Sequence, residues 1–452
     1  MRPRVAFLRA YAAAYRGASS FLARRLRNNF YLHLAGLFSL FVLLDVLFLH
    51  RIVDMRQATY DLVVKNRIVK PAPDPSLVIV DIDEKSLAAM AKEYGRWPWP
   101  RQVLGEFVEN VAQQKPKAIV FDILFSDPDV FNVDSDAYFN EVIARTPNVF
   151  FPYLRLPSKD DALSQLKIEM IPGAFRTESA QDNRTIAVVL PYFKAALSGG
   201  RLGTFNVEPD ADGIIRKYPI WLEAYGWQLP SLPLRVGQAL GAPPPARHSP
   251  LLNWRGPAFS YKYVSFSDVY LDALNKQRTR PPNEFADRIV LIGSTAAGLG
   301  DIKPTSTARQ FPGLEIVATA IDNVIHNDFI RVPATRWPYF VVALLIVWGT
   351  AIAFYRAVEP DLFARVFGLS QIGLLVISYL SINFSNFFFN LTGPVFLGFV
   401  YFSIAKVYAM ATARALERNV VAESLRGGGT RIATMAVFQI AGRDDTSTAI
   451  FM

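Results

Sequence analysis

Acidic side chains follow two apolar runs that have the composition of buried strands. The run VIVDIDE places Asp81, Asp83 and Glu84 after the first strand, and IVFDILFSDPD places three more acids after the second: Asp122, Asp127 and Asp129. In open α/β sheets ligands bind outside the carboxyl ends of the strands, so these carboxylates are candidates for a divalent cation or a basic ligand. The candidate metal ligands are Asp81, Asp83 and Asp122. Acids at strand ends also cap helices and turns, and the sequence leaves both interpretations open.

Two tryptophans and an arginine lie in the extended segment Trp97-Pro98-Trp99-Pro100-Arg101, directly before a predicted helix. A guanidinium beside large aromatic rings can bind an anion or a carboxylate, which makes Trp97, Trp99 and Arg101 candidate ligand-binding residues. The alternative is a structural cover, with both rings over the sheet and Arg101 paired with a strand-end acid. Either interpretation puts the segment near the acidic cluster.

Two glycine-containing loops partly match ligand-binding motifs. The loop Glu208–Gly213 begins like a calcium loop but lacks the later ligands, including a Glu about twelve residues after the first Asp. It predicts a tight turn at Asp212, with Arg216 on the following strand and weak cation binding as the lesser alternative. The loop Gly293–Asp301 follows a predicted strand and can offer backbone N–H groups to an anion, but it lacks the Lys and the spacing of a P-loop.

Residues for catalysis are few. No Gly-x-Ser-x-Gly elbow is present, and the four histidines show no metal-ligand spacing: His33, His50, His248 and His326. Cysteine is absent, which removes thiol catalysis, thiolate metal sites and disulfides. The sequence therefore predicts a protein that is not an enzyme and needs no cofactor, with a divalent cation at the strand ends left open.

Composition points to a membrane. Of 452 residues 51% are apolar and only 19% are charged, which is more apolar sequence than a soluble core usually buries. The net charge of +9 is compatible with an anionic bilayer. No Lys/Arg run is interleaved with aromatic residues, so nucleic acid is not an expected partner.

Four apolar stretches have the length of a membrane span, which needs about 20 residues for a hydrocarbon core of about 30 Å. One lies near the N-terminus and three near the C-terminus, and a Gly393-Pro394 step is expected to kink the last. The expected segments are a basic N-terminus 1–28, spans at 29–49, 338–355, 367–384 and 387–410, a large domain 50–337 and a tail 411–452.

Arginine distribution sets the expected orientation. Seven arginines precede the first span and others follow the last, among them Arg414, Arg418, Arg426 and Arg431, so both ends are expected in the cytoplasm of a bacterial-type cytoplasmic (inner) membrane. The large domain then lies on the periplasmic or extracellular side. The lipid bilayer is an expected partner.

The large domain alternates short apolar runs with amphipathic stretches, which predicts an α/β fold with a mostly parallel sheet. Antiparallel additions are expected at 199–220 and 253–264. Helices are expected at 101–114 and 136–145, and strands at 77–82, 118–121, 149–153, 186–190 and 289–292.

Taken in order, the motifs of this domain resemble the CHASE2 family of extracytoplasmic sensor domains. The motifs are VIVDIDEKSL, WPWPR, KAIVFDILFSDPD, FNVEPDADGIIRKYPI, LNWRGP, RIVLIGSTAAGLGD and PGLEIVATAIDNVI, within residues 51–331. The resemblance implies a bacterial transmembrane receptor that senses an unidentified ligand and drives a cytoplasmic cyclase, kinase or diguanylate cyclase. The residues of this sequence that match the family's motifs are Asp83, Trp97, Pro98, Arg101, Asp122, Asp212, Gly213, Arg216, Gly293 and Asp301. The resemblance does not assign their roles.

The tail departs from that pattern, because no cyclase or kinase domain fits after the last span. Residues 411–425 are expected to continue as a helix that ends at Gly427-Gly428-Gly429, and 432–441 and 446–452 are expected to form two strands. Output would come from a cytoplasmic signalling protein or another membrane subunit, with a homodimer also open. A truncated gene product is the alternative explanation of the short tail.

Three hypotheses for function follow. The first is a sensor subunit without an output domain of its own, and the second is a scaffold for an envelope complex. The third is a metal-assisted hydrolase built on Asp83 and Asp122.

Overall fold

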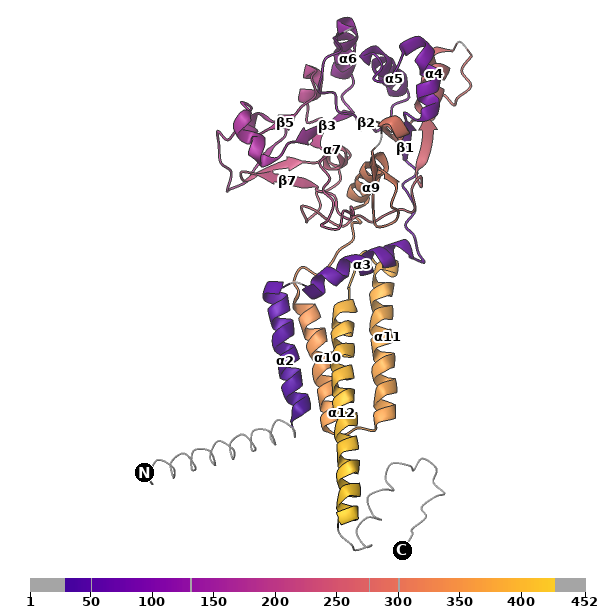
Figure 1. Cartoon of the computed structure of the whole chain (residues 1–452). Coiled ribbons are helices and arrows are strands. Elements are labelled where there is room, and N and C mark those ends of the chain that lie inside the picture. The colour runs from indigo at the N-terminus through magenta and orange to yellow at the C-terminus, as the bar shows by residue number, and fades with distance from the viewer. Residues whose placement is uncertain (1–28, 50, 131, 276, 300, 427–452) are drawn as a thin grey trace. The chain divides into compact units, whose positions relative to one another are not determined.

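The computed structural model divides the chain into two compact units (Figure 1). The helical unit comprises Met1–Gln57, Pro333–Ser378 and Asn390–Met452, and the α/β unit comprises Ala58–Val332 and Tyr379–Phe389. The structure describes residues 29–49, 51–130, 132–275, 277–299 and 301–426.

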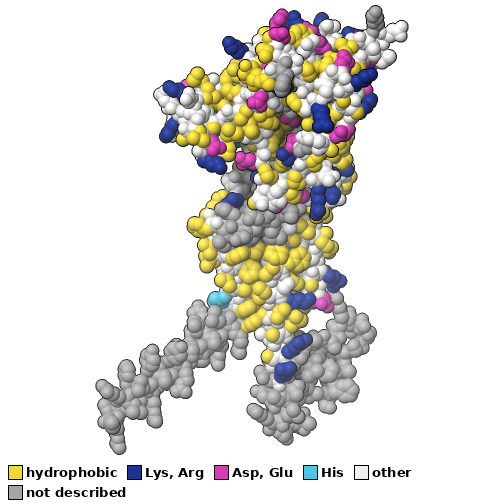
Figure 2. Space-filling model, turned by 45° about the horizontal axis from the view of Figure 1, so that its top comes forward, with side chains coloured by type: hydrophobic (Ala, Val, Ile, Leu, Met, Phe, Trp, Pro, Cys, Tyr) yellow, Lys and Arg dark blue, Asp and Glu magenta, His cyan; other side chains and the backbone are white. Residues whose placement is uncertain are grey.

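The helical unit contains four helices that are long and apolar enough to cross a membrane. Apolar side chains remain exposed along them, as at Leu345 and Leu369, and Figure 2 shows a mainly hydrophobic surface over this unit. Such a surface suits lipid better than water. The helices are α2 (Phe30–Leu44) continued by a π-helical segment η1 (Asp45–Leu49), α10 (Trp337–Tyr355), α11 (Pro360–Phe384) and α12 (Thr392–Arg426).

The last helix differs from the expected span 387–410. It begins at Thr392, so Gly393 and Pro394 lie in its first turn. Backbone N–H groups in the first turn have no partner within the helix, so proline removes no hydrogen bond there. The predicted kink inside the span was wrong for this reason. The predicted helix 411–425 is confirmed, since α12 runs to Arg426. The two strands expected in the tail lie outside the described residues.

The α/β unit is built on a sheet with strand order β5-β3-β2-β10-β1-β9, with β6 also paired to β3. All pairs are parallel except β3 with β5, so the predicted parallel sheet is confirmed. The strands are β1 (Leu77–Asp81), β2 (Ala118–Phe121), β3 (Val149–Arg155), β5 (Val188–Val189), β6 (Leu202–Thr204), β9 (Lys262–Ser265) and β10 (Ile289–Gly293).

Alternate side chains of the central strands enter two separate cores. On β1, Val78 and Val80 belong to one core, whereas Leu77 and Ile79 belong to the other. Every residue of β1, β2 and β10 is buried, as expected for parallel strands that are covered on both faces.

Helices cover both faces of the sheet (Figure 1). Buried residues of α4, α5, α6 and α8 pack in the first core, and those of α7 and α9 pack in the second, which makes three layers. The α/β unit also includes the end of α3 (Arg51–Lys65). The covering helices are α4 (Glu84–Tyr94), α5 (Arg101–Gln113), α6 (Val133–Arg145), α7 (Leu232–Ala239), α8 (Phe266–Leu274) and α9 (Gly313–His326).

The antiparallel strands lie mostly elsewhere than predicted. Within 199–220, the named strand β6 pairs in parallel with β3, and antiparallel pairing is limited to a single bridge between Lys217 and Leu251. Within 253–264 the only named strand residues belong to β9, which is parallel to β1. The patterns were misread because short apolar runs do not reveal strand direction. The antiparallel pieces are β4 (Phe175–Arg176), β7 (Trp221–Ala224) and β8 (Trp227–Pro230), which form one sheet, and β11 (Ile302–Lys303) with β12 (Phe311–Pro312).

Short 3-10 helices complete the described elements of this unit. They are η2 (Ser158–Leu163), η3 (Ile168–Met170), η4 (Lys194–Leu197) and η5 (Ala297–Leu299).

Candidate functional site

The acids after β1 are held by the protein's own donors. Asp81 is buried and accepts hydrogen bonds from the backbone N–H and the hydroxyl of Thr295. Asp83 caps α4, where it accepts from the Ser86 backbone N–H at 2.7 Å and from the Ser265 hydroxyl at 2.9 Å. Capping of this kind was the structural alternative for these residues.

The glycine-containing loop after β10 donates to these same acids. Thr295 N–H reaches Asp81 at 2.8 Å, and Ala297 N–H reaches Glu84 Oε1 at 2.9 Å. Two of the N–H groups that we expected to meet an anion therefore face carboxylates of this chain.

Asp122, after β2, lies in a different setting. Strand β10 separates β2 from β1, so Asp122 is not beside Asp81 or Asp83. Its Cβ lies next to Gly293, where an added Cβ would come within 3.3 Å of it. The side chain is half-buried, and its charged neighbours are Asp301 and Lys303, which form an ion pair at 2.8 Å.

Burial is the main cause of an unusually high pKa at Asp122. It raises the pKa of Asp122 to about 7, Asp301 adds to the rise and Lys303 opposes it. The carboxyl of Asp122 therefore changes charge near neutral pH, unlike an ordinary aspartate.

The acidity of Asp122 predicts a pH-dependent stability. The folded chain holds this proton more tightly than the unfolded chain, so the stabilising contribution is complete below about pH 4 and is lost as the pH rises through about 7. We expect Asp122→Asn to raise the free energy of unfolding at pH 8 by about 2 kcal/mol, discounted for partial solvent access, and to change it little at about pH 4. Denaturant unfolding of the full chain in detergent at both pH values measures this. Glu178→Gln, at an exposed acid, is the control; an equal effect of Asp122→Asn at both pH values would contradict the assignment.

The described residues include no group of three or more His, Asp or Glu side chains that could hold a metal ion. Asp81, Asp83 and Asp122, the candidate metal ligands, are divided between two places at the carboxyl edge of the sheet.

The tryptophan segment and the loop after β2 enclose a groove of about 540 Å³. Trp97, Trp99, Arg101 and Asp127 all line it, so the structure brings these four candidate residues together. Trp99 is 1% exposed and packs on Phe266, whereas Trp97 is only half-buried and meets Trp99 edge to face at 5.0 Å. Trp99 therefore has the covering role and Trp97 keeps an accessible surface.

Arg101 lies in this groove among acidic groups. Its guanidinium is 4.9 Å from the centre of the Phe125 ring, 3.4 Å from the Asp127 carbonyl oxygen and 3.9 Å from the Asp136 carboxylate. These contacts are long and leave its N–H groups incompletely used, which keeps the residue available to a ligand.

Arg216 has three acidic partners. Its buried guanidinium contacts Asp61, Asp210 and Asp212, at 2.5, 3.0 and 2.6 Å. The predicted turn at Asp212 is present, with Gly213 at φ +80°. Because Asp212 and Arg216 pair with each other, this cluster fixes the turn to the end of α3.

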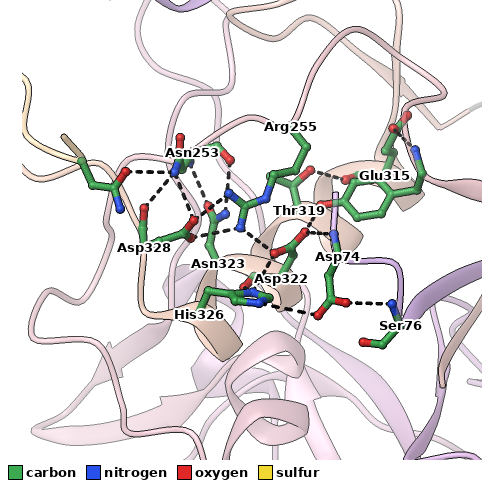
Figure 3. A network of polar contacts seen from close by, with 12 residues as sticks. Asp74, Ser76, Asn253, Arg255, Glu315, Thr319, Asp322, Asn323, His326 and Asp328 are labelled. Carbon is green, nitrogen blue, oxygen red and sulfur yellow. Dashed lines mark hydrogen bonds and ion pairs between the residues drawn. The ribbon is translucent and has the colours of Figure 1, made fainter. Parts of the chain in front are cut away.

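A larger buried polar network was missed by sequence reasoning (Figure 3). Its centre is Arg255, 6% exposed, whose guanidinium contacts Asp322 and Asp328 at 2.5 and 2.6 Å. Asp322 also accepts from the Tyr261 hydroxyl and the Asp74 backbone N–H, both at 2.9 Å. The network thus joins the chain before β1 to the end of α9.

Helix α9 supplies most of these polar groups. Glu315, Asp322, Asn323 and His326 recur at intervals of 7, 8 and 11 residues from the first, which places them on one side of a helix. Glu315 accepts the backbone N–H groups of 259–261. Polar residues on one face of an otherwise apolar helix were the sequence signal that could have revealed the network.

The last turns of α11 belong to this unit and are held by the same region. The Arg67 guanidinium donates to the Asn253 side chain at 2.6 Å and to the Ile382 carbonyl at 2.7 Å. Asn383, 4% exposed, accepts the backbone N–H of Ile68 at 2.8 Å, and Tyr379 donates to the Asn66 carbonyl at 2.6 Å. We call this set of contacts between 66–68 and 379–383 the α11 clamp.

Comparison with known proteins agrees with these features. No curated protein and no solved structure matches the chain significantly. The model of the CHASE2 domain matches residues 35–354, which includes the groove and the Arg255 network and confirms the resemblance read from the motifs. Since this match covers more than half of the sequence, the chain belongs to the CHASE2 domain family, a family of sensor domains.

Proposed function

We propose that the chain is a receptor subunit of a bacterial cytoplasmic membrane, with its α/β unit on the outer side. In this proposal a ligand binds the groove, and α11 passes the change to a cytoplasmic partner that supplies the output. No catalytic step is assigned to the chain. The orientation is supported by the arginines before the first span and after the last, which are Arg2, Arg4, Arg9, Arg16, Arg24, Arg25, Arg27, Arg414, Arg418, Arg426, Arg431 and Arg443.

The α11 clamp is the observation that carries this proposal. Residues 360–378 of α11 belong to the helical unit, and residues 379–384 of the same helix belong to the α/β unit. Rearrangement of 66–68 therefore acts directly on hydrogen-bonded groups of α11. Arg331 extends the clamp, because its N–H donates to the Asn386 carbonyl at 2.6 Å and its carbonyl accepts from Phe388 at 2.7 Å.

A ligand shifts such a receptor only when it binds two arrangements with different affinity. The groove is formed by loops at the carboxyl ends of the strands. Arg67 and Asn253, in contrast, lie in the segments that precede strands β1 and β9. The rigid element between them is the central sheet, all of whose residues in β1 and β2 are buried. In this proposal the signal changes the hydrogen bonds of the α11 clamp, and the central sheet keeps its structure.

The partner can be identified from the native membrane. We expect crosslinking, affinity purification and mass spectrometry with the full chain to recover a kinase or cyclase. A chain stopped after Arg426 is expected to lose it. Recovery of envelope-assembly proteins alone, retained without residues 427–452, would instead indicate a scaffold.

The clamp is tested with Asn383→Leu. This change removes the acceptor of the Ile68 N–H, so we expect the partner to remain bound while its product or phosphorylation no longer follows the signal. Asn110→Leu, at a half-buried position of α5, is the matched control. A normal response from Asn383→Leu would exclude the clamp as the route of transfer.

A further inference from the structure

The groove beside Trp97 continues into a second hollow of about 390 Å³. Tyr94, Pro100 and Asn132 line both hollows, so the two form one cleft along the start of α5. Its combined size is in the range of sites that hold organic molecules. We call it the α5 cleft.

Acidic side chains dominate the α5 cleft. Glu106, Asp127, Asp129 and Asp134 line it, and Arg101 is the sole basic side chain among its lining residues. Asp136, the ion-pair partner of Arg101, adds a fifth carboxylate nearby. One guanidinium cannot balance five carboxylates, so the cleft attracts cations.

Aromatic side chains of the α5 cleft also favour binding of an organic cation. Trp97 is half-buried and presents an accessible ring, and Tyr94 lies along both hollows. The Tyr94 hydroxyl is 3.0 Å from that of Tyr270, which donates to Glu106. A tryptophan ring next to carboxylates is the setting in which amines and guanidinium groups bind by cation–π attraction.

A buried donor marks the same wall. The indole Nε1 of Trp99 has no hydrogen-bond partner among the described residues, although the side chain is 1% exposed and lines the cleft. Buried donors are nearly always paired in proteins. An acceptor on a ligand that displaces the side chains covering Trp99 would supply the missing partner.

We propose that the α5 cleft binds an organic cation, an amine or guanidinium on an apolar chain that also bears a hydrogen-bond acceptor. The inference rests on the proposed sensor function and names the class of its ligand. The cation lies by Trp97 and the carboxylate of Asp127, which line the same hollow, and the acceptor faces Trp99.

The test uses the full chain in lipid nanodiscs and isothermal titration calorimetry. The probes are Nα-acetyl-argininamide and Nα-acetyl-lysinamide, and the matched neutral probe is Nα-acetyl-citrullinamide, which keeps the shape and the acceptors. We expect at least one cationic probe to bind about tenfold more tightly than the neutral one, and added salt to weaken that binding.

Two variants locate the site. Trp97→Leu is expected to weaken binding of the cation about tenfold, and Asp127→Asn about threefold. Glu178→Gln, an exposed acid that lines neither hollow, is expected to change nothing. Circular dichroism of each variant, unchanged from that of the wild type, establishes that a loss of binding is local.

Equal binding of the citrulline probe, undiminished binding to Trp97→Leu, or no binding of either cation at millimolar concentration would overturn the inference. Those results leave the proposed function intact, because it is judged by partner recovery and by Asn383→Leu. Failure of those two experiments together with cation binding would instead leave a binding protein without signal transfer.

Discussion

Replacement of Arg255 with leucine is expected to lower the free energy of unfolding of the α/β unit by about 3–5 kcal/mol. The change leaves the carboxylate of Asp322 buried at 1% exposure without its cationic partner, and the carboxylate of Asp328 loses two contacts. The hydrogen bonds that Asp322 keeps, from the Tyr261 hydroxyl and the Asp74 backbone N–H, do not replace the guanidinium in a site that excludes water.

Denaturant unfolding of the full chain in detergent, followed by tryptophan fluorescence, measures the loss at Arg255. Arg278→Leu, at an exposed arginine, is the control and is expected to stay within about 0.5 kcal/mol of the wild type. A double variant, Arg255→Met with Asp322→Leu, should recover part of the loss because it removes both buried charges. Loss of stability in the double variant that equals or exceeds that of Arg255→Leu would show that packing, not charge, dominates.

Arg216→Met is expected to cost about 3 kcal/mol at pH 7, because three carboxylates then lose the guanidinium they share, and Lys217 contacts only one of them, Asp210. Hydrogen bonding to Arg216 is the first cause of the lowered pKa of Asp212. A lowered pKa contributes stability above the unfolded value, and that contribution is lost as the pH falls through the folded value. The difference between wild type and Arg216→Met should therefore shrink below about pH 4.

Thermal unfolding of the full chain at pH 7 and at acid pH measures the Arg216 effect. Lys217→Met is the neighbouring control, since Lys217 contacts only Asp210 among the acids and is more exposed. A difference between wild type and Arg216→Met that stays constant with pH would contradict a charge-based role for this cluster.

Local features of the fold could be predicted because each depends on residues close in sequence. Strand 118–121 has the predicted bounds, and α5 begins at Arg101 as predicted, after a proline that suits a helix start. The four apolar helices follow equally from composition.

Strand order could not be predicted in the same way. The apolar runs of β1, β2 and β10 are alike, and nothing within them reveals which are neighbours. For that reason the sequence left open whether Asp122 meets Asp83, and the structure separates them by β10.

Of the candidate site, the groove residues were found because Trp97, Trp99 and Arg101 have unusual chemistry in a short segment. Arg255 was missed although its motif LNWRGP had been noticed, because its partners Asp322 and Asp328 are distant in sequence. A buried ion pair is a property of the folded chain, and its two halves look like ordinary surface residues beforehand.

The position of β10 has a consequence for biogenesis. This strand lies between β1 and β2 in the sheet, yet it is synthesised after β1, β2 and β3. Until β10 is made, the edges of β1 and β2 that pair with it have no hydrogen-bond partner. Folding then depends on contacts between residues far apart in the sequence, and such contacts form slowly. Until they form, unpaired strand edges that can pair with other chains remain exposed. A nascent chain of this protein must therefore be protected from aggregation until nearly the whole of the α/β unit has left the ribosome.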